Sequence, residues 1–279
     1  MPAFDPDSLP PLRDVIARHG LMAKKSLGQH FLCDLNLTRR IAACAGDLKG
    51  CTVFEIGPGP GGLTRALLAT GAEKVIAIEK DRRCIEALGS LVEAAQGRLQ
   101  IIEADALKCD LPSQATGPLA IVANLPYNIG TELLIKWLHE IDAYRSLTLM
   151  FQSEVVDRLV AKPGGKVYGR LSVITQFCCD AARAFNIPAR AFTPPPKVDS
   201  SVVHLTPRAN RVPDLPLESL EAITAAAFGQ RRKMLRSGLR ALGGEEVLNK
   251  CGINPESRAE TLSVADFVTL ARAMIGPKS

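Results

Sequence analysis

Residues 51–64, CTVFEIGPGPGGLT, place the strongest constraint on what this 279-residue chain can fold into. Val53, Phe54 and Ile56 form a short apolar run that is typical of a buried strand, and the glycines after it lead into a helical pattern. Glycine lets the backbone pass close to a ligand at positions where any Cβ would collide. The segment therefore predicts a strand, a tight glycine loop and a helix, with a cofactor lying across the loop.

The chain after this loop continues to alternate between strands and helices. We expect helices at 63–70 and 81–95, and strands at 75–78, 99–102 and 119–123. This alternation predicts an α/β fold with a mostly parallel, doubly wound sheet. Ligands in such sheets bind beyond the carboxyl ends of the strands. The residues at those ends are Gly57, Glu79, Asp105 and Asn124.

The remaining segments predict the domain organisation. We expect further helices at 12–19, at 35–45 with Asp34 as N-cap, at 131–139 and at 153–161, and further strand material at 147–151, 168–175, 180–185 and 202–205. Two alanine- and leucine-rich helices are expected at 217–242 and 254–274, after a proline-bounded linker at 207–216. This predicts an N-terminal extension at 1–22, a cofactor-binding domain at 23–206 and a small all-helical domain at 207–279.

The glycine loop does not identify its cofactor. The spacing Gly57-x-Gly59-x-x-Gly62, followed by Glu79, fits a nicotinamide dinucleotide as well as S-adenosylmethionine, because both present an adenosine ribose to the same carboxylate. A phosphate-binding P-loop is disfavoured because no Gly-Lys-Ser/Thr follows. A glycine turn that holds no ligand is the structural alternative.

The tetrapeptide Asn124-Leu-Pro-Tyr127 favours methyl transfer to a purine amine. The exocyclic amine is a poor nucleophile because its lone pair is delocalised into the ring, so acceptors for its two hydrogens are needed. The Asn124 side-chain oxygen and the Leu125 carbonyl supply such acceptors. Pro126 fixes φ near about −65° and so holds that carbonyl in one direction, while the Tyr127 ring offers a face for a flipped base. The structural alternative is a tight turn without chemistry.

Five blocks of this sequence, in this order, resemble one known family. They are LGQHFL at 27–32, EIGPGPG at 55–61, ANLPYNI at 123–129, FTPPPKVDSSV at 192–202 and FGQRRKMLR at 228–236. The chain resembles the small-subunit ribosomal RNA adenine dimethyltransferases of the KsgA/RsmA type over nearly its whole length. The resemblance implies a Rossmann-like S-adenosylmethionine-dependent methyltransferase domain with a helical C-terminal domain. It also implies transfer of methyl groups to the N6 atoms of two adjacent adenines near the 3′ end of small-subunit rRNA, during ribosome assembly.

The resemblance further implies roles for single residues. Cofactor contacts would come from Gln29, His30, Leu32, Gly57, Gly59, Glu79, Asp105 and Asn124. The catalytic set would be Asn124, Leu125, Pro126, Tyr127 and Phe192. Glu79 would bind the cofactor ribose and Asp105 its adenine, while Tyr127 and Phe192 would sandwich the target base. Many bacterial members carry Asn at the position of His30, and a buried structural histidine is the competing interpretation there.

The basic run Arg231, Arg232, Lys233 and Arg236 is the predicted RNA-binding element. No acidic residue occurs between positions 228 and 242. On one continuous helix, Arg232, Arg236 and Arg240 would form a stripe that neutralises phosphates. A solvated helix face is the alternative, and Lys24 and Lys25 form a second, weaker candidate.

Composition adds the expected compartment and partners. The net charge of +5 suits a polyanion but is modest, and the eight cysteines lack paired metal-ligand spacing, so we expect reduced thiols and no metal site. No apolar run is long enough to span a bilayer, and the N-terminus lacks a secretory signal. We therefore expect a cytoplasmic protein with no membrane partner. The resemblance implies that it acts on small-subunit rRNA within a nearly assembled 30S subunit, and we expect it to be a monomer.

Three other functions remain open at this stage. A nicotinamide-dependent oxidoreductase would leave the tetrapeptide at 124–127 unexplained. A non-catalytic RNA-binding assembly factor would not need Asn124, Tyr127 and Asp105 intact. A large-subunit rRNA adenine N6-methyltransferase of the antibiotic-resistance type shares the loop and the tetrapeptide, but the proline-rich block at 192–202 and the basic run favour the small-subunit activity.

Overall fold

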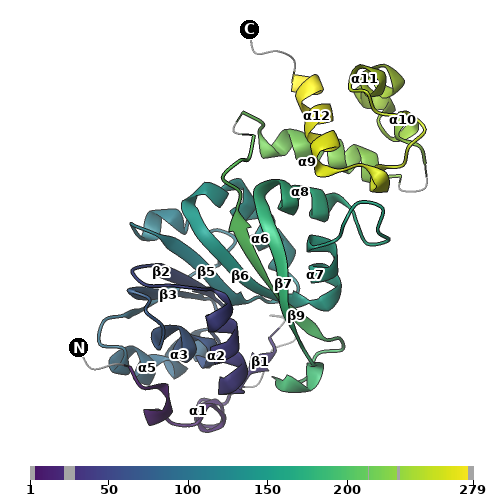
Figure 1. Ribbon diagram of the computed structural model, residues 1–279. Coiled ribbons are helices and arrows are strands. Elements are labelled where there is room, and N and C mark those ends of the chain that lie inside the picture. The colour runs from purple at the N-terminus through teal and green to yellow at the C-terminus, as the bar shows by residue number, and fades with distance from the viewer. Residues whose placement is uncertain (1–3, 22–28, 213, 231–232, 276–279) are drawn as a thin grey trace. The chain divides into compact units, whose positions relative to one another are not determined.

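The computed structural model describes residues 4–21, 29–212, 214–230 and 233–275. The chain forms two compact units, each with contacts mainly within itself (Figure 1). The first unit comprises Met1–Val156 and Ala182–Pro207, and the second comprises Asp157–Ala181 and Arg208–Ser279. The sequence analysis assigned 157–181 to the cofactor-binding domain, whereas the structure groups this segment with the C-terminal helices.

In the described part of the chain, the main sheet has seven strands in the order β4-β3-β2-β5-β6-β9-β7. Their bounds are β2 Thr52–Ile56, β3 Lys74–Glu79, β4 Leu99–Glu103, β5 Leu119–Asn124, β6 Tyr144–Gln152, β7 Cys179–Ile187 and β9 Ser200–Pro207. Strands β2 to β6 pair in parallel, and β9 joins β6 antiparallel. The predicted doubly wound, mostly parallel sheet is confirmed.

The strand order reverses direction between β2 and β5. Strands β3 and β4 follow on one side of β2, while β6 and later strands follow on the far side of β5. Ligands in open α/β sheets bind at such a switch point, outside the carboxyl ends of the strands. Gly57 follows β2, and Asn124 is the last residue of β5, so the topology itself places the predicted site between them.

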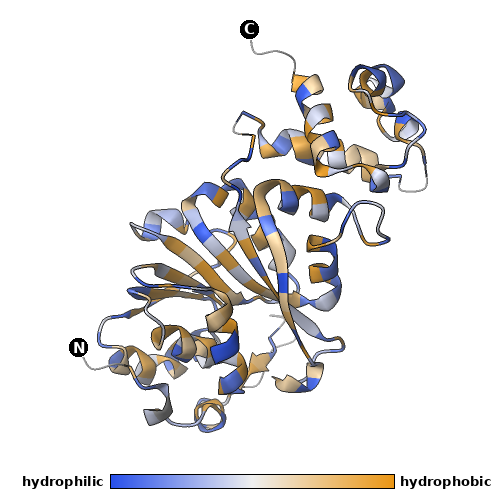
Figure 2. Ribbon diagram, in the orientation of Figure 1, coloured by the Kyte–Doolittle hydropathy of each residue, from blue (hydrophilic) through white to orange (hydrophobic). Residues whose placement is uncertain are grey.

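The core of the first unit lies where apolar strands meet apolar helix faces. Every residue of β2 is buried, as expected for a central parallel strand covered on both faces. Figure 2 shows that the strands of the main sheet consist largely of hydrophobic residues. Helices α2 Leu35–Cys44 and α3 Gly62–Leu68 lie on one face of the sheet (Figure 1). The other helices of this unit are α4 Arg82–Ala87, α5 Gly89–Ala94 and α6 Gly130–His139, with short 3-10 turns at Pro112–Gln114 and Ile141–Ala143. Helix α7 Ser153–Leu159 begins in this unit and ends in the second.

Residues 4–21 are part of the first unit. Helix α1 Leu12–Arg18 buries Leu12 and Val15, and the Arg65 guanidinium donates a hydrogen bond to the Pro10 carbonyl at 2.8 Å. A 3-10 turn at Pro6–Ser8 precedes it. The predicted cap of the next helix is confirmed, because the Asp34 carboxylate accepts the first free N–H groups of α2.

A separate pair of short strands joins distant parts of the sequence. Strand β1 Phe31–Leu32 pairs antiparallel with β8 Phe192–Thr193, which follows a 3-10 turn at Ala189–Ala191. The register places Leu32 opposite Phe192 and Phe31 opposite Thr193. This pairing brings the segment before α2 beside the proline-rich turn that follows β8.

The second unit is helical. It contains α8 Arg170–Cys178, α9 Leu217–Phe228, α10 Leu235–Gly238, α11 Gly244–Lys250 and α12 Val264–Ile275, with 3-10 turns at Arg240–Leu242 and Ala259–Thr261. Its core includes an aromatic cluster in which Phe228 stacks on Phe267 with ring centroids 5.5 Å apart and meets Tyr168 edge-on at 6.1 Å. The predicted all-helical C-terminal region is confirmed.

Some predicted elements were wrong. Residues 168–175, predicted as strand material, lead into helix α8, because Val173, Ile174 and Phe177 bury one helical face and this packing overrides β-propensity. The helix predicted at 81–95 divides into α4 and α5 at Leu88. The helix predicted at 254–274 begins only at Val264, and α11 was missed.

The predicted continuous helix at 217–242 was also wrong. Helix α9 ends at Phe228, followed by Gly229, a poor helix former. The next turn, α10, is held from outside, because the N–H groups of Leu235 and Arg236 donate to the carbonyls of Ser257 and Pro255. The side chain of Leu235 is buried, so tertiary packing decides where the second helix begins.

Candidate functional site

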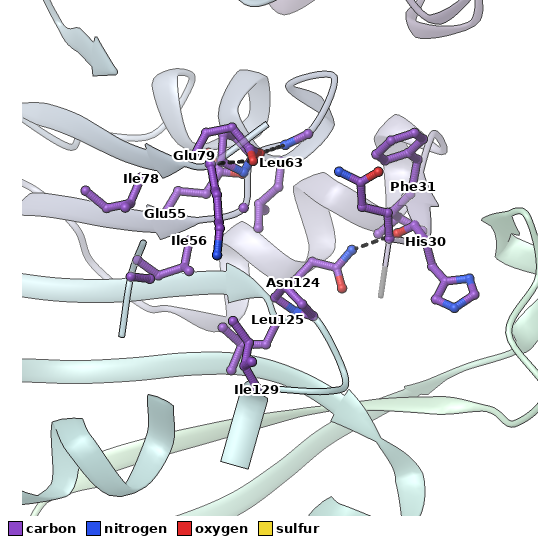
Figure 3. A pocket seen from close by; sticks show the side chains of 18 of the residues that line it. His30, Phe31, Glu55, Ile56, Leu63, Ile78, Glu79, Asn124, Leu125 and Ile129 are labelled. Atoms are coloured by element: carbon purple, nitrogen blue, oxygen red, sulfur yellow. Dashed lines mark hydrogen bonds between the residues drawn. The ribbon is translucent and has the colours of Figure 1, made fainter. Parts of the chain in front are cut away.

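A cavity of about 250 Å³ opens at the carboxyl ends of β2, β3 and β5 (Figure 3). It is the site that the strand order predicts, and it lies within the first unit. Every residue predicted from sequence to bind the cofactor lines it, as does the whole tetrapeptide after β5. These residues are Gln29, His30, Leu32, Gly57, Gly59, Glu79, Asp105, Asn124, Leu125, Pro126 and Tyr127.

The glycine loop forms one wall of the cavity, and its glycines serve different purposes. Gly57 has φ +67°, a backbone conformation that residues with side chains rarely adopt, and a Cβ placed on it would meet the Pro126 ring at 3.9 Å, an ordinary van der Waals distance. A Cβ on Gly62 would lie only 2.6 Å from the Leu32 carbonyl oxygen. Gly57 thus supplies a backbone conformation that other residues rarely adopt, while Gly62 lets helix α3 approach β1.

Glu79 is held in place by backbone donors. Its Oε2 accepts the Gly59 N–H at 3.2 Å, and its Oε1 accepts the N–H groups of Lys80 and Asp81, both at 2.8 Å. Burial raises the pKa of Glu79, and these backbone donors partly oppose that rise. The carboxylate therefore ties the glycine loop to the end of β3 and presents its remaining lone pairs to the cavity (Figure 3).

Asp105 lies beyond the end of β4 at the rim of the same cavity. Its Oδ2 forms an ion pair with the Lys80 ammonium at 2.9 Å, and its Oδ1 accepts the Leu107 N–H at 3.1 Å. The hydrogen bond from Lys80 holds the pKa of Asp105 below its ordinary value. Asp105 is therefore an ionised hydrogen-bond acceptor at neutral pH.

Gln29 approaches the cavity from the segment before β1. Its side-chain amide donates to the Asp81 carboxylate at 3.2 Å. Asp81 is also bound by the Arg83 guanidinium at 2.6 Å, and this hydrogen bond lowers the pKa of Asp81 to about 2. The contact fixes the start of the segment that contains His30 and Leu32 against the end of β3.

Glu55 is a cavity residue to which the sequence analysis gave no role. It lies on β2, only 1% exposed, and its Oε2 has no hydrogen-bond partner among the described residues. Burial raises its pKa to about 8, opposed by the Thr64 hydroxyl and reinforced by the charge of Glu79. The available signal was a glutamate inside the apolar run of β2, two residues before Gly57. A buried carboxyl at this point gives the cavity a polar group that a cationic ligand would satisfy.

The tetrapeptide turns sharply from β5 into α6. The Pro126 carbonyl accepts the N–H groups of Ile129 and Gly130, at 3.2 and 3.0 Å, which closes the turn. The Asn124 amide nitrogen donates to the His30 carbonyl at 3.3 Å, and Figure 3 shows the amide oxygen directed away from that contact. Because the nitrogen is the end that meets a carbonyl, the oxygen is the end left to accept hydrogens from a substrate.

Tyr127 and Phe192 have different surroundings. The Tyr127 hydroxyl is hydrogen-bonded to the Ser200 hydroxyl, and its ring stacks on the His30 imidazole with centroids 5.4 Å apart. Phe192 is 2% exposed and packs in the hydrophobic core beside Leu32 instead of lining the cavity. In this conformation the Phe192 ring therefore presents no face to a base, which differs from the role that the sequence assigned to it.

The predicted RNA-binding residues lie in the second unit. Arg231 and Arg232 fall outside the described residues. Lys233 and Arg236 are exposed, and Arg236 forms a surface ion pair with Glu256 at 3.7 Å. Arg236 and Arg240 do not share the one continuous helix that the sequence predicted, since Arg236 lies on α10 and Arg240 begins a separate 3-10 turn.

The cavity fits S-adenosylmethionine. It combines a glycine loop along one wall, a fixed carboxylate of the kind that accepts hydrogen bonds from ribose hydroxyls, and a buried carboxyl oxygen without a partner among the described residues. In the described chain, no cluster of three or more His, Cys, Asp or Glu side chains is suited to a metal ion. None of the described helices is long and apolar enough to cross a membrane.

Comparison with known proteins decides the family. A family model described as ribosomal RNA adenine dimethylase matches residues 20–275. The chain belongs to this family. The resemblance carried by the five sequence blocks is thereby confirmed.

Individual relatives agree with the family. Proteins named ribosomal RNA small subunit methyltransferase A are similar to this chain: one from Rhizobium etli (strain CIAT 652) is 58% identical over 272 residues, covering 96% of this chain and 98% of that protein. One from Paramagnetospirillum magneticum (strain ATCC 700264 / AMB-1) is 60% identical over 267 residues, covering 95% of each.

Solved structures extend the agreement to the fold. A dimethyladenosine transferase from Plasmodium falciparum aligns with a TM-score of 0.76 at 27% identity, covering 86% of this chain and 96% of the other. The 23S rRNA methyltransferase ErmE aligns with a TM-score of 0.69 at 25% identity, covering 88% and 99%. The adenine dimethylase family thus has this architecture, and the similarity to small-subunit enzymes is far higher than that to ErmE.

Proposed function

We propose that this protein transfers methyl groups from S-adenosylmethionine to the N6 amines of two adjacent adenines near the 3′ end of small-subunit rRNA, during ribosome assembly. The observation that carries the proposal is the fixed Asn124 amide, whose nitrogen is bound to the His30 carbonyl while its oxygen stays available at the cavity. The high identity to small-subunit methyltransferases over almost the whole chain supports the choice of substrate.

The chain's own residues bind and align the reactants. Glu79 would hold the ribose of the cofactor, Asp105 its adenine, and the residues Gln29, His30, Leu32, Gly57 and Gly59 would complete the pocket. When bound, the cofactor supplies an electrophilic sulfonium methyl group. Neither a metal ion nor a covalent enzyme intermediate is needed for its transfer, so positioning accounts for much of the acceleration.

The tetrapeptide would prepare the acceptor amine. The Asn124 oxygen and the Leu125 carbonyl accept the two N6 hydrogens, which draws the nitrogen lone pair out of conjugation with the purine. Pro126 fixes the direction of the Leu125 carbonyl, and Tyr127 supplies a face on which the base stacks. As the N–C bond would form, the bond between the methyl carbon and the sulfonium sulfur would break, a neutral thioether would leave, and the amine would lose a proton to solvent. A second transfer requires the monomethylated amine to return with its methyl group turned aside.

We assign RNA binding to the basic segment at 231–236. Lys233 and Arg236 are exposed and suited to phosphate contacts, and neither reads sequence. Selection of the target loop therefore depends on shape and on the assembled particle. We accordingly place the protein in the cytoplasm, acting as a monomer on a nearly assembled 30S subunit.

Mapping of methylated adenines tests the proposal directly. Purified protein and S-adenosylmethionine labelled at the methyl group are incubated separately with small subunits, large subunits and free rRNA from cells that lack this gene. We expect label only in small subunits, in two adjacent dimethylated adenines near the 3′ end of their RNA. Label in large-subunit RNA, or none in any particle, would refute the assignment.

A further inference from the structure

The Tyr127 side chain is fixed at both of its ends. Its backbone belongs to the turn after β5, which the Pro126 carbonyl closes by accepting the N–H groups of Ile129 and Gly130. At the far end of the ring, the phenol hydroxyl is hydrogen-bonded to the Ser200 hydroxyl. A bond at the tip of the ring restricts rotation about both side-chain torsions. The plane of this cavity-lining ring is therefore set by two segments that lie far apart in the sequence.

Ser200 is a rigid point of attachment. It is the first residue of β9, is 0% exposed and pairs with Gln152 of β6. The residue before it is also held, because the Asp199 carbonyl accepts the Ser153 N–H and its carboxylate accepts the Ala189 N–H, both at 2.9 Å. The start of β9 is thus fixed to the neighbouring strand and to the segment before β8.

The two hydroxyls satisfy each other. Burial raises the pKa of the Tyr127 phenol, and the hydrogen bond with Ser200 partly opposes that rise, so the phenol is protonated at neutral pH. The Ser200 side chain is buried, and the Tyr127 hydroxyl is its hydrogen-bond partner among the described residues. A buried hydroxyl that loses its partner costs free energy, so this bond favours one orientation of the ring.

We propose that Ser200 is a positioning residue for methyl transfer, which holds the Tyr127 ring in the plane on which the acceptor base stacks. This inference rests on the proposed transfer of methyl groups to a flipped adenine. Ser200 is buried and is not among the residues that line the cavity, so it acts through Tyr127 and not by contact with a reactant. The proline-rich block at 192–202 thereby reaches the tetrapeptide through a residue to which the sequence analysis gave no role.

The next residue along β9 provides a matched control. Ser201 is also 0% exposed, but successive side chains of a strand point to opposite faces of the sheet. Its hydroxyl donates to the Asn186 side-chain oxygen at 2.8 Å and lies 2.9 Å from the Ser153 hydroxyl. Replacing Ser201 by alanine therefore removes buried hydrogen bonds from the same strand without breaking the contact to Tyr127.

A double-mutant cycle tests the inference on the full-length protein. The variants are Ser200→Ala, Tyr127→Phe, the combination of the two, and the control Ser201→Ala. Tyr127→Phe keeps the ring and removes only its hydroxyl, so it breaks the same bond from the other side. The measurements are kcat and KM for unmethylated small subunits, and Kd for S-adenosylmethionine from calorimetry. Urea unfolding followed by Trp137 fluorescence establishes that each variant is folded under the assay conditions.

We expect Ser200→Ala and Tyr127→Phe each to lower kcat by about three- to tenfold, the equivalent of one net hydrogen bond. The double variant should be no slower than the slower single variant, because both changes break one bond. The KM for subunits and the Kd for the cofactor should stay within about twofold of the wild type, since Ser200 contacts neither reactant. Ser201→Ala should keep the kcat of the wild type.

Four results would overturn the inference. They are wild-type kcat in Ser200→Ala, losses that multiply in the double variant, a parallel loss of cofactor binding, and an equal loss of kcat in Ser201→Ala. Failure of the wild type itself to methylate small subunits would instead refute the proposed function.

Discussion

Glu55→Gln offers a test of the cavity's electrostatics that does not depend on activity. Glu55 is 1% exposed on β2, and its Oε2 has no partner among the described residues. Burial, and then the neighbouring charge of Glu79, raise its pKa from 4.5 to about 8 against the effect of the Thr64 hydroxyl. At pH 7 the carboxyl is therefore neutral in the folded chain and ionised in the unfolded chain.

The sign of the effect on stability follows from proton binding. Between pH 4.5 and about 8, the folded chain holds a proton at Glu55 that the unfolded chain has released. The contribution of this proton is fully present below pH 4.5 and is lost as pH rises through about 8. Each pH unit within this window corresponds to about 1.4 kcal/mol, so between pH 6 and pH 9 the free energy of unfolding should fall by about 3 kcal/mol.

Urea unfolding at pH 6 and pH 9 measures this change. Trp137 is the chain's single tryptophan and is fully buried on α6, so its fluorescence reports the first unit. The wild type should lose about 3 kcal/mol more than Glu55→Gln over this interval, since glutamine does not ionise. Exposed Glu93→Gln serves as the control and should follow the wild type. An equal pH dependence in the wild type and Glu55→Gln would show that Glu55 is not neutral in the folded chain.

Three further changes test other parts of the structure. Glu79→Gln places an amide nitrogen against the backbone donors of Gly59 or Lys80. The Kd for S-adenosylmethionine, measured by calorimetry, should therefore rise about tenfold or more, while kcat at saturating cofactor should change little. Arg236→Glu should weaken binding to small subunits and reduce the salt dependence of that binding. The control Arg272→Glu, at an exposed position in α12, should do neither. Equal binding by both variants would leave Arg236 as a solvated surface residue. Gly62→Ala puts a Cβ 2.6 Å from the Leu32 carbonyl oxygen, so the free energy of unfolding, measured by urea denaturation, should fall by about 1–3 kcal/mol. The control Gly89→Ala, where a Cβ would meet open space, should not lower it.

The sequence could predict which residues of the candidate cofactor site lie together because their signals are local. The glycines at 57–62, the carboxylate of Glu79 and the tetrapeptide from Asn124 each follow a short apolar strand, and strand ends meet at one edge of a parallel sheet. The structure accordingly places them around one cavity. Asp34 as a helix cap was predictable for the same reason, since capping involves only its next neighbours.

The misses depended on contacts between distant segments. The place where α10 begins is set by carbonyls of Pro255 and Ser257, about twenty residues away, which no local pattern reveals. The burial of Phe192 follows from the pairing of β8 with β1, and so does the approach of His30 to Pro194. Helix α8 was mistaken for a strand because its β-branched residues have strand propensity that burial overrides.

Asn124→Ala tests the central claim most directly. Methyl transfer to small subunits and S-adenosylmethionine binding are measured side by side for the wild type, for Asn124→Ala and for the exposed control Asn249→Ala on α11. We predict that Asn124→Ala binds the cofactor within a few fold of the wild type but transfers methyl groups about a hundredfold more slowly or worse, because it lacks the acceptor for the amine hydrogens. Normal turnover by Asn124→Ala would contradict the account.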